Sequence, residues 1–107
     1  TEGVKIHPRV LAAAPQAPIV VKHYPDAFAD TTLHELLKAG GVDELLVCGM
    51  MTQHCVTYTS LSPRAGSYRK LTVLRDAVTT LSETVNKLAL GGLGRRVGMA
   101  TVDEALA

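Results

Sequence analysis

Four short apolar runs, spaced evenly and separated by segments with helical periodicity, constrain this chain most strongly. They occupy residues 19–22, 45–48, 71–74 and 97–100. Strands buried on both faces of a parallel sheet are continuous apolar runs, and crossover helices connect them. The pattern therefore predicts an α/β fold with three α/β/α layers, in which helices flank a Rossmann-like parallel sheet.

Threonines mark the beginnings of three predicted helices. Each stands three residues before a glutamate, the spacing of a capping box: Thr32 with Glu35, Thr80 with Glu83, and Thr101 with Glu104. Glycines at 40–41 and at 91–94 are predicted to end the first two of these helices. A fourth, weaker helix is expected from Cys55 and should end by Pro63.

Residues 1–18 differ from the rest of the chain. They contain three of the five prolines and show no period, so we predict an irregular lead-in followed by one domain over residues 19–107. The composition is 47% apolar and 20% charged with a net charge of +1, which is typical of a globular protein. Neither a disordered chain nor a nucleic-acid-binding one is indicated.

The cysteines and the hydropathy indicate a compartment. Two cysteines seven positions apart do not make a disulfide framework, and no basic-then-apolar signal segment opens the sequence. The longest uncharged stretch, residues 10–21, is short and broken by two prolines, so it does not predict a membrane span. We therefore expect a cytoplasmic protein that binds neither membrane nor nucleic acid.

Cys55 is the candidate nucleophile. It follows the apolar run 45–48 and Gly49, at the point where a helix should begin. The positive end of a helix dipole favours a thiolate, and the unpaired N–H groups there can hold an oxyanion. A buried, unreactive helix cysteine is the alternative that base rates favour for an isolated cysteine.

Three motifs support the reactive interpretation. In order they are VVKHYPDAFADTTL at 20–33, LVCGMMTQHCV at 46–56 and AGSYRKLTVLRDA at 65–77. Together they resemble the isochorismatase-like cysteine hydrolases, the superfamily that includes nicotinamidases and N-carbamoylsarcosine amidase. The resemblance covers nearly the whole chain after residue 18, and Gly-x-x-Thr-x-x-Cys-Val after a buried strand is its most specific element.

The resemblance assigns roles to four residues. It implies that Cys55 is the nucleophile and that Lys22, at the end of its strand, activates the thiolate. It implies a cis peptide bond between Met50 and Met51, with the N–H groups of Met51 and Cys55 forming the oxyanion hole. A solvated strand-end lysine is the alternative for Lys22.

Substrate-binding residues also follow from the resemblance. It places Thr52 of the signature, and the aromatic side chains of Tyr24 and Phe28, near the substrate pocket. Ordinary packing is an equally weighted alternative for the two aromatic residues.

One catalytic group of the family has no counterpart in this sequence. The resemblance implies an aspartate at the end of the first strand, in an N-terminal portion that this chain does not match. We therefore expect the C-terminal part of a larger domain, whose sheet lacks its first strands. A partner that supplies the aspartate is the alternative. The family's metal ligands belong to the same portion, so we assign no metal and no cofactor.

The implied activity is hydrolysis of a small amide or related C–N bond through an acyl-enzyme, crippled without the aspartate. One alternative is a catalytically inactive remnant serving as an oligomerisation or binding module. Another is isochorismatase-type cleavage of a vinyl ether, although relatives with that activity do not use a cysteine here. An unpaired sheet edge predicts a homo-oligomer, and the expected ligand is a small-molecule substrate.

Other reactive side chains have structural interpretations. Cys48 lies inside a predicted buried strand and is expected in the core. His54 is expected to point away from Cys55, because adjacent helical residues diverge. Asp76 is expected to tie down a loop through hydrogen bonds. The remaining histidines have no partners at metal-ligand spacing: His7, His23 and His34.

Overall fold

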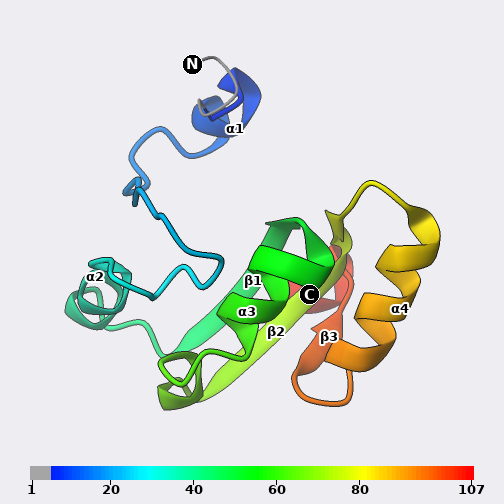
Figure 1. Cartoon of the computed structure of the whole chain (residues 1–107). Helices are drawn as coiled ribbons and strands as arrows, with labels where there is room; N and C mark the ends of the chain where they lie inside the picture. Colours follow the sequence, from blue (N-terminus) through cyan, green and yellow to red (C-terminus); the bar gives the residue numbers. More distant parts are fainter. Residues whose placement is uncertain (1–5) are drawn as a thin grey trace.

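The computed structural model describes residues 6–107 and contains a parallel sheet of three strands (Figure 1). The strands are β1 (Glu44–Met50), β2 (Lys70–Thr79) and β3 (Gly98–Ala100), in the order β1-β2-β3. They match three of the four predicted apolar runs. The α/β class with a parallel sheet is confirmed.

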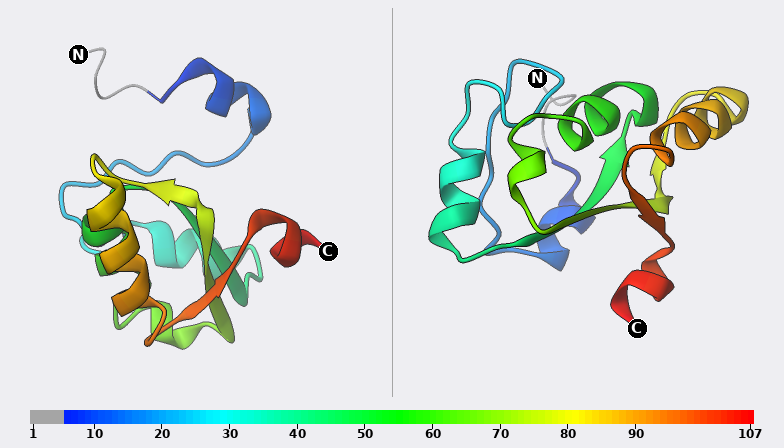
Figure 2. Two further views of the ribbon diagram at one scale, coloured as in Figure 1. Left: turned by 90° about the vertical axis from the view of Figure 1, so that its right-hand side faces the viewer. Right: turned by 90° about the horizontal axis from the view of Figure 1, so that it is seen from below.

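Helices lie on both faces of this sheet. Figure 2 shows α3 (Thr57–Ser60) and α4 (Glu83–Leu93) on one face and α5 (Val102–Leu106) on the other. The larger core cluster lies under α4 and consists of Val56, Val73, Val78 and Leu93. This packing fixes the segment after β1, because Val56 belongs to that segment.

The predicted strand at 19–22 is wrong. These residues pair with no strand in the described part of the chain, and the side chains of Ile19 and Val21 are 62% and 74% exposed. An isolated strand leaves its backbone groups and apolar side chains without partners, so sequence pattern alone does not stabilise it.

The lead-in is only partly irregular. A short helix, α1 (Pro8–Ala13), forms within it and stands apart from the sheet (Figures 1 and 2). Pro8 occupies the first helical position, where its missing N–H costs nothing. Residues 1–5 of the predicted lead-in lie outside the described residues.

The helix beginnings follow the predictions only in part. Helix α2 (Leu33–Ala39) forms after Thr32, but the Thr32 side chain makes no capping hydrogen bond. Helix α4 is capped by Ser82, whose hydroxyl accepts from the N–H of Val85, and not by Thr80. The capping box between Thr101 and Glu104 is present at α5.

One of the two predicted helix ends differs from the prediction. Helix α2 ends at Gly40, as expected, and Gly41 follows with a φ of +71°, a conformation that suits glycine. Helix α4 instead continues through Gly91 and Gly92, and Gly94 is its C-cap. The predicted terminator at 91–94 therefore acts only through its last glycine.

One face of β1 is uncovered. Leu46 and Met50 are 41% and 56% exposed, and Cys48 between them is exposed as well. The prediction that Cys48 packs in the core is therefore wrong, because its side chain is exposed. β1 is also an edge strand, so its outer backbone groups face no neighbouring strand.

No helix within residues 6–107 is long and apolar enough to cross a membrane.

Candidate active site

The segment after β1 turns sharply into a helix. Gly49 has a φ of +113°, a value that glycine adopts readily, and the peptide bond between Met50 and Met51 is cis. A single π-helical turn, η2 (Thr52–Val56), follows and leads directly into α3. Cys55 is thus the fourth residue of the helical segment, whereas the sequence predicted the segment to begin at Cys55.

Lys22 reaches Cys55 across a large separation in sequence. Its Nζ lies 3.2 Å from Cys55 Sγ, although 33 residues separate the two. The same ammonium donates to the carbonyl oxygen of Tyr24 at 3.0 Å. The lysine is solvent-exposed, yet two contacts hold its charge beside the half-buried sulfur.

His54 also approaches the sulfur. Its Nδ1 lies 3.8 Å from Cys55 Sγ, within the range of a weak hydrogen bond to sulfur. The imidazole meets the ring of Tyr58 edge-on, with centroids 5.6 Å apart and an interplanar angle of 80°. The expectation that His54 points away is wrong: adjacency was the only sequence signal, and in this π-helical turn it brings the two side chains together.

Thr52 anchors the turn from inside. It is fully buried, and its hydroxyl donates to Oδ1 of Asn86 on α4. Its carbonyl oxygen accepts from the hydroxyl of Thr57 at 2.5 Å. The Thr52 side chain therefore supports the turn from inside. The role near the substrate pocket that the resemblance implies for Thr52 stays a prediction. Sequence reasoning missed Asn86, since nothing marks it within a helix.

The two aromatic residues predicted near the substrate pocket, Tyr24 and Phe28, differ in exposure. Tyr24 is 53% exposed and lies beside Lys22 through its backbone carbonyl. Phe28 is 6% exposed and packs with Ala65 and Tyr68 in the second core cluster. For Phe28 the packing interpretation holds.

A cavity of about 300 Å³ adjoins Phe28 and β1. Its lining is mostly apolar and includes Leu45, Val47 and Cys48, whereas Cys55 is not part of it. This cavity is therefore separate from the sulfur.

The oxyanion-hole candidates lie in the same turn. Met51 immediately precedes η2, and its carbonyl oxygen accepts from the N–H groups of His54 and Val56 at 3.0 and 3.3 Å. Those bonds fix the peptide planes around Cys55. The structure thus brings Lys22, His54 and Cys55 together next to the Met51 backbone.

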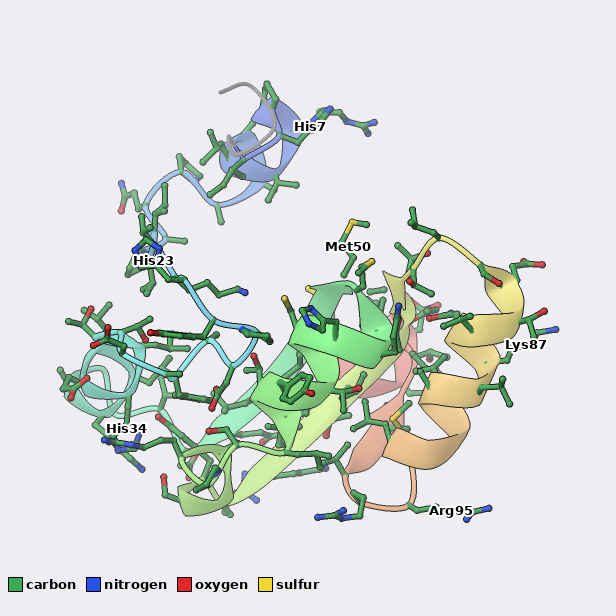
Figure 3. All side chains as sticks on the ribbon, in the orientation of Figure 1. His7, His23, His34, Met50, Lys87 and Arg95 are labelled. Atoms are coloured by element: carbon green, nitrogen blue, oxygen red, sulfur yellow. The ribbon has the colours of Figure 1, made fainter. Side chains whose placement is uncertain are left out.

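Other candidate residues have structural partners. Asp76 accepts from the N–H of Val102 at 2.9 Å and so holds the beginning of α5, the kind of structural tie expected for it. His34 Nδ1 lies 3.1 Å from the Tyr68 hydroxyl. His7 and His23 lie away from the sheet, on the segment that contains α1 (Figure 3). Within residues 6–107, no three His, Cys, Asp or Glu side chains are placed to hold a metal ion.

Comparison with known proteins decides the family. A model of the isochorismatase domain matches residues 1–103. The chain belongs to the isochorismatase family. Solved structures of this family share its fold: a putative isochorismatase hydrolase from Oleispira antarctica superposes with a TM-score of 0.86 at 27% identity. That match covers 99% of this chain and 61% of the other.

Curated relatives of this isochorismatase-family chain include hydrolases. The chain is 40% identical over 80 residues to the uncharacterized isochorismatase family protein YddQ of Bacillus subtilis, covering 75% of this chain and 43% of that protein. It is 43% identical over 60 residues to a streptothricin hydrolase of Streptomyces noursei, covering 56% and 21% respectively. A "probable inactive nicotinamidase" of Arabidopsis thaliana is 32% identical over 78 residues, covering 70% and 40%. The chain therefore spans less than half the length of these relatives.

Proposed function

We propose that this chain carries the nucleophile of a hydrolase that cleaves a small amide or related C–N bond. The observation that carries the proposal is the 3.2 Å contact between Lys22 Nζ and Cys55 Sγ. An ammonium beside a sulfur stabilises the thiolate, which is the nucleophilic form of cysteine. The relative named streptothricin hydrolase supports a hydrolytic function.

The proposed reaction proceeds through an acyl-enzyme. The Cys55 thiolate attacks the substrate carbonyl carbon, and the N–H groups of Met51 and Cys55 receive the developing oxyanion. The C–N bond breaks as the leaving nitrogen takes up a proton, and water then hydrolyses the thioester. Lys22 stabilises the sulfur anion before the attack and again when the thioester is cleaved.

We propose that the catalytic aspartate implied by the resemblance is supplied from outside this chain. Within residues 6–107, the side chains that hydrogen-bond to Cys55 Sγ are Lys22 and His54. The free edge of β1 and the exposed residues Ile19 and Val21 offer backbone and apolar surface to further strands. We propose that such strands complete the site, and that a homo-oligomer shields the remaining surface.

Thiol labelling tests the nucleophile. Cys48 is exposed as well, so the measurement uses the Cys48→Ser background, with Cys55→Ser as the blank. At neutral pH, iodoacetamide should label Cys55 faster than free cysteine, and Lys22→Ala should slow labelling by about tenfold through loss of the neighbouring charge.

Lys87→Ala on α4 is the matched control, because Lys87 is exposed and points away from the sheet (Figure 3). It should label like the parent, and circular dichroism should show all variants folded. Labelling no faster than free cysteine, or unaffected by Lys22→Ala, rejects the proposal.

A second candidate is a binding module without catalytic activity. It is favoured by the lack of any carboxylate among the groups that hydrogen-bond to Cys55 or Lys22 in the described part of the chain. Ammonia release from a panel of small primary amides, measured with the proposed completing strands present, distinguishes the two, since only the hydrolase releases it. Both cysteines are free, which supports the proposed cytoplasmic location.

A further inference from the structure

We propose that Thr59 positions Lys22 against Cys55 by holding the backbone of the loop that follows Lys22. The inference rests on the proposed function and adds a positioning residue to it. It starts from two hydrogen bonds of the Thr59 hydroxyl, on α3. This hydroxyl accepts from the N–H of Ala27 at 2.9 Å and donates to the carbonyl oxygen of Pro25 at 3.3 Å.

Sheet pairing does not hold the segment that contains Lys22. Residues 19–22 pair with no strand in the described part of the chain, and they lie outside its helices. The lysine side chain adds further freedom, because its charge sits at the end of a flexible stem. The 3.2 Å contact between Lys22 Nζ and Cys55 Sγ therefore needs another attachment nearby in the chain.

Thr59 supplies this attachment from the helical segment that carries Cys55. It follows Cys55 by four residues in continuous helical backbone, so the two side chains lie on the same side of the segment. Cys55 Sγ receives the Lys22 ammonium, and one turn further on Thr59 holds residues 25–27. Its two bonds span 32 and 34 residues of sequence, so they attach the loop to the helix. A hydroxyl has both donor and acceptor sites, so one side chain makes both bonds.

The constraint reaches the ammonium through one peptide group. The carbonyl of Tyr24 and the ring nitrogen of Pro25 belong to the same planar unit, and the proline ring restricts φ to about −65°. Holding Pro25 therefore limits the directions open to the Tyr24 carbonyl. That oxygen accepts from Lys22 Nζ at 3.0 Å, and the same nitrogen lies 3.2 Å from Cys55 Sγ. Thr59 thus acts on the sulfur through Lys22.

Labelling of Cys55 by iodoacetamide at neutral pH tests this connection, again in the Cys48→Ser background. Thr59→Val removes the hydroxyl with little change of shape and should slow labelling about threefold, since the ammonium is then held less closely to the sulfur. Thr59→Ser keeps a hydroxyl and should restore most of the parent rate. Thr84→Val, at an exposed threonine of α4, is the matched control and should label like the parent.

A double variant shows whether the effect passes through Lys22. In the Lys22→Ala background, Thr59→Val should slow labelling no further, because the group that Thr59 positions is absent. An equal slowing with and without Lys22 identifies a purely structural role and overturns the inference. Thr59→Ala repeats the test in a variant that should keep α3 formed, because alanine has the higher helix propensity, and circular dichroism checks the fold of each variant.

The outcomes separate this inference from the proposed function. If Lys22→Ala slows labelling but Thr59→Val and Thr59→Ala label like the parent, the role of Thr59 is overturned and the nucleophile stands. If Lys22→Ala leaves labelling unchanged, or the parent labels no faster than free cysteine, the proposed function and the inference fail together.

Discussion

The hydroxyl of Thr52 donates a hydrogen bond to Oδ1 of Asn86, joining the turn that carries Cys55 to the N-terminal half of α4. Thirty-four residues separate the two side chains, and Thr52 is fully buried. A buried hydroxyl needs a partner, because leaving it unpaired costs the full desolvation penalty. The position of the nucleophile therefore depends on a helix that begins well after it in sequence.

Replacing Asn86 by alanine should destabilise the protein. The change leaves the buried Thr52 hydroxyl without its acceptor, which costs about 1–3 kcal/mol. Urea unfolding followed by circular dichroism measures the loss. Lys87→Ala, at the next and exposed position of α4, should stay within about 0.5 kcal/mol of the parent. Equal stability of the two variants would show that the bond contributes nothing.

The apolar runs in the sequence predicted strands correctly where a neighbouring strand pairs with them. Residues 45–48 and 71–74 lie in β1 and β2, whose register places Leu45 opposite Leu71. The run at 19–22 is also mostly apolar and β-branched but has no neighbouring strand in the described part of the chain, so it stays unpaired. Strand formation depends on a partner that a local pattern does not reveal.

Sequence motifs identified the main residues of the candidate site but not the arrangement of the side chains around them. Lys22 and Cys55 were named from the resemblance, and the structure places their side chains in contact. His54 and Asn86 were missed, since their positions depend on the shape of η2 and on helix packing. The structural role of Thr52 was not predicted, because burial is a tertiary property.

Acid should weaken the attachment of α5 through Glu104. Hydrogen bonds from Thr101, first from its backbone N–H, and the nearby Arg75 lower the pKa of this carboxyl. A folded-state pKa below the unfolded value means that the stabilisation is present above the unfolded pKa and is lost as pH falls through the folded one.

Thermal melts from neutral to acid pH measure this effect. Glu104→Gln should melt below the parent near neutrality, and the difference should shrink as the pH falls below the ordinary carboxyl range. Asp103→Asn is a control at the adjacent exposed position. A difference that stays constant with pH would contradict the assignment to carboxylate ionisation.

High pH should destabilise the folded protein through ionisation of Tyr68. Burial raises the pKa of this phenol, Glu35 raises it further, and Arg64 opposes the shift. Its contribution to stability is therefore complete below the unfolded pKa and is lost as pH rises through the folded one. The tyrosinate absorbance of the parent should contain a late component at high pH, which Tyr68→Phe removes. Full ionisation of all three tyrosines without such a component would contradict the burial of Tyr68 against Phe28.

The uncovered face of β1 should make this chain self-associate. Leu46, Cys48 and Met50 are exposed on an edge strand, and an unpaired edge is a template for pairing with another chain. Leu46→Lys should lower the association measured by sedimentation velocity over a range of concentrations, because a charge on an edge strand opposes pairing. Leu81→Lys is the matched control, since Leu81 is 91% exposed but lies outside the sheet. If both variants associate like the parent, the contact between copies lies elsewhere on the molecule, and β1 is left for the strands that complete the site.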